Sequence, residues 1–117
     1  MTTAALIGLD HTVVTVGSAA TFTCRSPTCT TESSEPRLVW SFAAVDEKYE
    51  YVYLICVAPK CSITLTNNNR TSLLTINDVQ LIDAGQYKCS AYCHDHNSKA
   101  VSNLSVVGKE ILFILCA

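Results

Sequence analysis

The chain has 117 residues, of which 49% are hydrophobic and 15% charged, and its formal net charge is −2. This length suits a single domain with a two-layer core, and the apolar content excludes a disordered chain. No run of lysine or arginine occurs, so the sequence predicts no nucleic-acid partner.

The elements expected in chain order are short strands, because β-branched and aromatic runs alternate with turn residues and no helical periodicity stands out. Residues 1–10 are interpreted as an N-terminal extension, 11–107 as one domain, and 108–117 as an apolar tail too short to cross a bilayer. The strands are predicted at 12–16, 19–25, 37–43, 49–57, 62–66, 71–76, 86–92 and 99–107.

The apolar residues of these strands recur at every second position. Since side chains of a strand point alternately to its two faces, such a pattern marks the face that is turned to the core. The residues predicted to face the core are Ala20, Phe22, Cys24, Leu38, Trp40, Phe42, Leu74, Ile76, Leu104 and Val106.

The segment 83–89 reads Asp-Ala-Gly-Gln-Tyr-Lys-Cys, and it follows Cys24 and Trp40 along the chain. In this order and at this spacing, these residues resemble the motif of the immunoglobulin superfamily. The resemblance implies an all-β, immunoglobulin-like Greek-key β-sandwich of two antiparallel sheets. It also implies a disulfide from Cys24 to Cys89 with Trp40 packed on it, and a tyrosine corner at Tyr87.

The stretch between Trp40 and Cys89 has room for strands C′ and D between strands C and E, and a seven-strand constant-type domain would usually need less chain here, so the resemblance is to the V-set or the I-set. Antigen-receptor variable domains carry Phe-Gly-x-Gly at the start of the last strand, where this chain has Ser-Lys-Ala-Val at 98–101. This departure favours a cell-surface adhesion or receptor module over an antigen receptor. The resemblance further implies that Lys60 pairs with Asp83.

Seven cysteines predict disulfides and hence an oxidising, extracellular or cell-surface location. Loops 26–36 and 93–98 are neighbours at one end of a variable-type sandwich, and each holds a cysteine. The bridges predicted besides the inter-sheet disulfide are Cys29–Cys93 and Cys56–Cys61. An exchange of partners among these four stays open, because sequence does not determine connectivity. Cys116 is then left over, either as a free thiol or as a link between two copies.

Tyr49, Tyr51 and Tyr53 alternate along the strand predicted at 49–57 and therefore share one of its faces. If the aliphatic residues of that strand point inward, the three tyrosines point outward. Tyr92 and Val39 are expected on the same outer surface. Tyrosine is enriched at interaction hot spots, so this surface is the predicted site for a protein ligand or for a second copy of the chain. The alternative is that the tyrosines point inward or merely cover an edge strand.

Two glycosylation sequons are present, at Asn69 in a predicted turn and at Asn103 in the last predicted strand. The sequence has no nucleophile elbow, no glycine-rich phosphate loop and no His-Glu-x-x-His motif. We therefore expect no enzymatic activity, no cofactor and no small-molecule substrate. The run Cys-His-Asp-His at 93–96 has poor spacing for zinc, so no metal site is predicted.

Two functional hypotheses follow from the sequence. The first is an extracellular recognition or adhesion module of a membrane-anchored receptor, including a receptor kinase ectodomain, which acts by protein–protein binding and in one version binds itself. The alternative is a soluble secreted immune-type binder that uses the disulfide-clamped loops 26–36 and 93–98.

Overall fold

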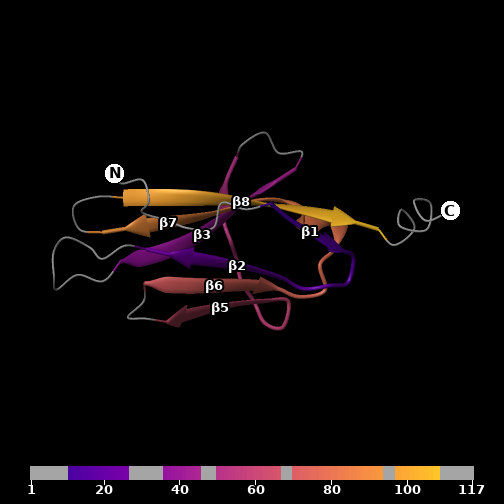
Figure 1. Ribbon diagram of the computed structural model, residues 1–117, viewed down its shortest axis with the longest axis horizontal. Helices are drawn as coiled ribbons and strands as arrows, with labels where there is room; N and C mark the ends of the chain where they lie inside the picture. The colour runs from indigo at the N-terminus through magenta and orange to yellow at the C-terminus, as the bar shows by residue number, and fades with distance from the viewer. Residues whose placement is uncertain (1–10, 27–35, 46–49, 67–69, 94–96, 109–117) are drawn as a thin grey trace.

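The protein is described by a computed structural model that covers residues 11–26, 36–45, 50–66, 70–93 and 97–108. Within these ranges, eight strands form two sheets that face each other as two layers (Figure 1). The larger sheet has the order β1-β8-β7-β3-β4 and the smaller one β2-β6-β5. Their bounds are β1 His11–Thr15, β2 Ala20–Arg25, β3 Arg37–Ala44, β4 Val52–Tyr53, β5 Cys61–Thr66, β6 Thr71–Ile76, β7 Gly85–Tyr92 and β8 Asn97–Val107. The predicted immunoglobulin-like sandwich is confirmed.

The core lies between the two sheets, where the alternating apolar residues predict it. Ala20, Phe22 and Cys24 of β2 are buried, while Thr21 and Arg25 between and beyond them are exposed. Cys24 is bonded to Cys89 of β7, with Cα atoms 6.4 Å apart, so a disulfide ties one sheet to the other. In the loop-entropy picture, this bridge stabilises the fold by about 4 kcal/mol.

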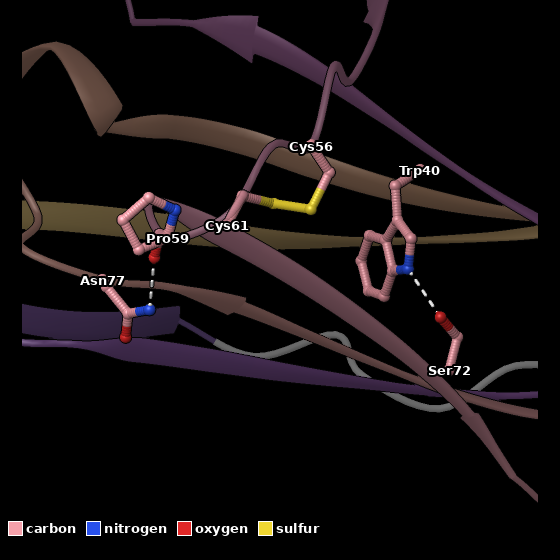
Figure 2. The surroundings of a disulfide bond; sticks show 6 residues. All are labelled: Trp40, Cys56, Pro59, Cys61, Ser72 and Asn77. Carbon is pink, nitrogen blue, oxygen red and sulfur yellow. Dashed lines mark hydrogen bonds between the residues drawn. A yellow bond between two sulfur atoms is a disulfide. The ribbon is translucent and has the colours of Figure 1, made fainter.

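Trp40 and Tyr87 fill the core around this disulfide. The indole Nε1 of Trp40 donates a hydrogen bond of 2.9 Å to the hydroxyl of Ser72, which is itself fully buried (Figure 2). This bond satisfies two polar groups that would otherwise be costly to bury. The ring of Tyr87 stacks on Phe22 at a centroid distance of 4.9 Å and packs against Phe42 at 4.8 Å.

A tyrosine corner fixes the entry to β7, as the resemblance implies. The hydroxyl of Tyr87 donates a 2.7 Å hydrogen bond to the backbone carbonyl of Asp83, the last residue of a short 3-10 helix, η2 (Leu81–Asp83). The Asp83 carboxylate accepts a bond from the backbone N–H of Gln80 and forms a 2.7 Å ion pair with Lys60. Gly85 follows at φ +152°, where a Cβ would lie 2.3 Å from the carbonyl oxygen of Ala43. Only glycine fits this position without strain.

Three expectations need correction. The predicted long strand at 49–57 is reduced to the two residues of β4. The backbone N–H of Leu54 still donates a hydrogen bond to the carbonyl of Trp40, after which the Cys56–Cys61 disulfide closes the segment before β5 begins. The larger sheet is also not wholly antiparallel. β1 runs parallel to β8, with His11 opposite Asn103, whereas all the other strand pairs are antiparallel. Asn97 and Ser98, assigned to a loop by sequence, begin β8.

The short disulfide holds the crossing from the larger sheet to the smaller one. Cys56 and Cys61 have Cα atoms 5.0 Å apart, and the side-chain amide of Asn77 donates a 2.8 Å hydrogen bond to the carbonyl of Pro59 between them (Figure 2). Cys61 is buried, and Leu54 and Cys56 pack against the core from the crossing segment. The bridge therefore anchors the segment that replaces the rest of the predicted strand.

Candidate interaction surface

The larger sheet has one face turned away from the smaller sheet, which we call the outer face. In β7, Tyr87, Cys89 and Ala91 are buried in the core, so Lys88 and Tyr92 lie on the outer face. The same assignment holds for the neighbouring strands, because residues paired across adjacent strands point to the same face. Ser41 lies opposite Lys88, and Tyr53 lies opposite Ser41. Together, the outer-face residues of the described strands include Arg37, Val39, Ser41, Tyr53, Gln86, Lys88, Ser90, Tyr92, Lys99, Val101 and Asn103.

Tyr53 and Tyr92 are the tyrosines that the outer face exposes, at 74% and 40% of their surface respectively. They do not touch each other. Counted along the register, they are two strands and four residues apart, which corresponds to about 16 Å between Cα atoms. Val39 lies between them and is half-buried, and the side chain of Ser41 is buried. Tyr49 lies outside the described residues.

Tyr51 behaves differently from its predicted partners. Its hydroxyl donates a hydrogen bond to the side-chain oxygen of Gln86, and the ammonium of Lys88 lies 4.2 Å from the centre of its ring. Tyr51 is therefore half-buried and engaged with β7. The predicted continuous stripe of tyrosines is thus broken on this face, because one of its members is used for packing. The contact also holds the Lys88 ammonium in place through a cation–π interaction.

The positive charge of the outer face was not predicted from the sequence. The five strands of the larger sheet carry Arg37, Lys88 and Lys99 and contain no aspartate or glutamate, although the whole chain has a net charge of −2. All three cations lie near Ser90 in the register. Lys99 is directly opposite Ser90, and Lys88 is two residues away from it on β7. Arg37 lies on β3, diagonal to Ser90. The alternation of side chains along β7 could have predicted the position of Lys88, because it places Lys88 on the face opposite to Tyr87 and Cys89.

A shallow hollow of about 300 Å³ opens at this place. It is lined by Lys88, Ser90, Tyr92, Asn97, Ser98 and Lys99, all from β7 and β8. Ser90 is the most buried of these residues, with 8% of its surface exposed, whereas Tyr92, Asn97 and Lys99 are exposed. The hollow is thus lined by two lysines together with two serines, one asparagine and one tyrosine.

The other predicted site residues lie around this face or outside the described chain. Asn103 is exposed on the outer face of β8, between Gln86 and His11 in the register. Asn69 lies outside the described residues, as do Cys29, Cys116 and the histidines of the 93–96 run. Cys93 is disulfide-bonded, but Cys29, its predicted partner, belongs to the part of the chain that is not described.

The described residues contain neither a helix that could span a membrane nor a cluster of metal-ligand side chains. No helix among them is sufficiently long and apolar to cross a membrane. Across the same residues, no group of three or more histidine, cysteine, aspartate or glutamate side chains is placed to hold a metal ion.

Comparison with known proteins places the fold in a defined family. The model of the immunoglobulin I-set domain matches residues 4–106. Among solved structures, a chimeric titin Z1Z2 carrying an exogenous decorin peptide is 22% identical, with a TM-score of 0.64, and the match covers 87% of this chain and 90% of that one. The titin M3 domain is 17% identical with the same TM-score, over 87% and 94% of the two chains.

A three-domain titin fragment, I67–I69, is 23% identical with a TM-score of 0.64, and the match covers 88% of this chain but 32% of that fragment. At such identities, the likeness to titin domains establishes the fold and nothing further. Among curated proteins, none matches the sequence.

Proposed function

Because the chain belongs to the immunoglobulin I-set family, we propose that it is an extracellular recognition module that binds a protein through the outer face of its larger sheet. Domains of this family are capable of protein–protein interaction. The single observation that carries the proposal is the outer face itself, which combines exposed tyrosines with the cations Arg37, Lys88 and Lys99, none of which forms an ion pair within the described residues, on a disulfide-linked sheet.

Disulfide bonding supports the extracellular location. Cys24–Cys89 and Cys56–Cys61 are both bonded, and Cys93 is disulfide-bonded as well, so all five cysteines in the described part of the chain are oxidised. Such density of disulfides in a small domain is typical of secreted and cell-surface proteins, because the cytosol keeps thiols reduced. We propose further that the native parent is anchored to a membrane as a receptor or adhesion molecule.

The exposure of Asn103 supports a glycan on the outer face. A glycan there would cover the region of Gln86 and His11 and leave the opposite end, with Lys99 and Tyr92, accessible. Four residues of β8 separate Asn103 from Lys99, which corresponds to about 13 Å. The partner would therefore approach over the end of the sheet that carries the hollow. Mass spectrometry of the domain secreted from animal cells measures occupancy of this sequon.

Binding is tested with a fluorescent tetramer of the domain on an array of cells, each displaying one extracellular protein of the source organism, with this chain included as its own ligand. We expect binding to at least one displayed protein and a loss of that binding in the variant Tyr53→Ala with Val39→Ala. Thr21→Ala with Thr23→Ala, on the outer side of β2, is the matched control. Binding that survives the first variant and is lost in the second would contradict the proposal.

Self-association is tested separately by analytical ultracentrifugation at high concentration. If the chain binds itself through this face, Tyr51→Ala with Tyr53→Ala lowers the association constant. An unchanged association constant would exclude the homophilic version and leave only a different protein as partner. Reduced and non-reduced electrophoresis reports whether Cys116 links two copies covalently.

A further inference from the structure

The hollow around Ser90 is lined by two lysines and by hydrogen-bonding side chains, so it favours a particular kind of ligand. We propose that it receives a carboxylate side chain from an acidic segment of the protein partner. The inference rests on the proposed function, because it assumes that the outer face is the binding surface. To the proposed function it adds the sign of the charge on the partner and the residues that contact this charge.

Charge complementarity is the first argument. Lys99 lies directly across from Ser90, and Lys88 is diagonal to Lys99, a relation that places their Cβ atoms about 7 Å apart. Like charges at neighbouring positions on one sheet face repel each other, and an anion bound beside them relieves this repulsion. The five strands offer no carboxylate to relieve this repulsion. Among the described residues, the carboxylate–cation pair that occurs is Lys60–Asp83, at the far side of the crossing segment.

Preorganisation is the second argument. The Lys88 ammonium already rests 4.2 Å from the centre of the Tyr51 ring, and the hydroxyl of Tyr51 is bonded to Gln86. The aromatic ring covers one side of the ammonium, and no hydrogen bond within the described residues engages its N–H donors. Ser90 is 8% exposed between the two lysines. A carboxylate in the hollow would thus accept charge-assisted hydrogen bonds from both ammoniums and one from a hydroxyl.

The shape of the hollow favours a protein side chain. Its volume of about 300 Å³ and its position on an open sheet suit one carboxylate with its neighbouring residues on the surface around it. Tyr92 forms one wall, and its exposed ring offers an apolar contact beside the charged site. Tyrosine is among the residues enriched at interaction hot spots.

The test is a titration of the ¹⁵N-labelled chain with three probes: blocked hexaglutamate, blocked hexalysine and 3′-sialyllactose. We expect hexaglutamate to shift the backbone amides of residues 88–92 and 97–99 and hexalysine to shift none of them. Lys99→Gln should weaken hexaglutamate binding by about threefold to fivefold, the effect of removing one partly exposed charge. Arg25→Gln removes the same charge from the exposed side of β2 and should leave the affinity unchanged.

Three results would overturn the inference. The first is shifts spread over both sheets, and the second is an equal loss in Lys99→Gln and Arg25→Gln, because each would mean attraction to net charge alone. The third is 3′-sialyllactose binding more tightly than hexaglutamate in the same hollow, which would assign the site to a glycan.

The cell array distinguishes a failure of this inference from a failure of the proposed function. Binding that is lost with Tyr53→Ala and Val39→Ala but retained with Lys99→Gln contradicts the acidic partner and leaves the binding face intact.

Discussion

The two faces of β7 show how one strand divides its residues between folding and recognition. Tyr87, Cys89 and Ala91 are buried, and they carry the tyrosine corner, the inter-sheet disulfide and part of the core. Lys88 and Tyr92 point the other way, onto the outer face. Since a sheet separates its faces completely, changes on one side need not disturb the other. The comparison predicts large losses of stability on the inner face and losses of binding without instability on the outer face.

The largest expected effect on the inner face comes from removal of the inter-sheet disulfide. The double variant Cys24→Ala and Cys89→Ala should lower the free energy of unfolding by about 4 kcal/mol, because the unfolded chain regains the freedom of a loop of 65 residues. Urea denaturation of the variant and the parent measures the difference. A loss below about 1 kcal/mol would mean that the sheets are held together by packing alone.

The next effect is expected at the turn before β7. Gly85→Ala places a Cβ 2.3 Å from the carbonyl oxygen of Ala43, at a φ of +152° that other residues rarely adopt. We expect a loss of about 3 kcal/mol, combining backbone strain with overpacking. Ala84→Gly, at the neighbouring position with an ordinary extended backbone, is the control for the altered turn. Equal losses in the two variants would show that the close approach to β3 is not the cause.

The tyrosine corner predicts a change that depends on pH. Burial, and secondarily the Asp83 carboxylate, raise the pKa of Tyr87 above its ordinary value of 10. The unfolded chain therefore loses this proton near pH 10 while the folded chain keeps it, and stability falls as the pH rises further.

Tyr87→Phe removes both the hydrogen bond and this titration. At neutral pH, it should cost about 1 kcal/mol for the lost bond to Asp83. Between pH 9 and pH 11, the difference between parent and variant should shift by about 1.4 kcal/mol in favour of the variant. Denaturation midpoints of the two proteins across this range measure the shift. A constant difference would contradict the raised pKa.

The smallest effect on stability is expected on the outer face. Lys99→Gln and Tyr53→Ala each remove an exposed side chain that forms no hydrogen bond or ion pair within the described residues, so each should change the unfolding free energy by less than about 0.5 kcal/mol. Tyr51→Ala should cost more, because its ring and hydroxyl contact Lys88 and Gln86. Thermal unfolding distinguishes the two groups. A loss for Tyr53→Ala as large as that for Tyr51→Ala would mean that both are packing residues.

The sequence predicted the inner face better than the outer one, for a physical reason. Core residues such as Trp40 and Tyr87 have fixed spacing and chemistry, since each must meet a particular partner across the sandwich. The end of β4 is set instead by a local closure, the Cys56–Cys61 bridge, which the sequence suggested without indicating that it would end the strand. The packing of Tyr51 could not be predicted from the sequence either, because it depends on Gln86, which is distant along the chain.

The basic hollow escaped prediction because its residues come together only through strand register. Lys88 and Lys99 are ordinary lysines along the sequence, and neither belongs to a charged run. Their proximity follows from the pairing of Ser90 with Lys99, which the number of residues between β7 and β8 does not determine by itself. The missing acidic residues in the five strands could be counted from the sequence once the strands were known.

The central claim is that recognition belongs to the outer face, and one matched pair of variants tests it most directly. Tyr53→Ala with Lys99→Gln alters the outer face, and Thr21→Ala with Arg25→Gln makes a comparable change on the exposed side of β2. Tetramers of both, with equal thermal stability established first, are applied to the cell array. We predict that the first loses binding at least tenfold and that the second binds as the parent does. Retained binding in the first variant, with loss in the second, would contradict the claim.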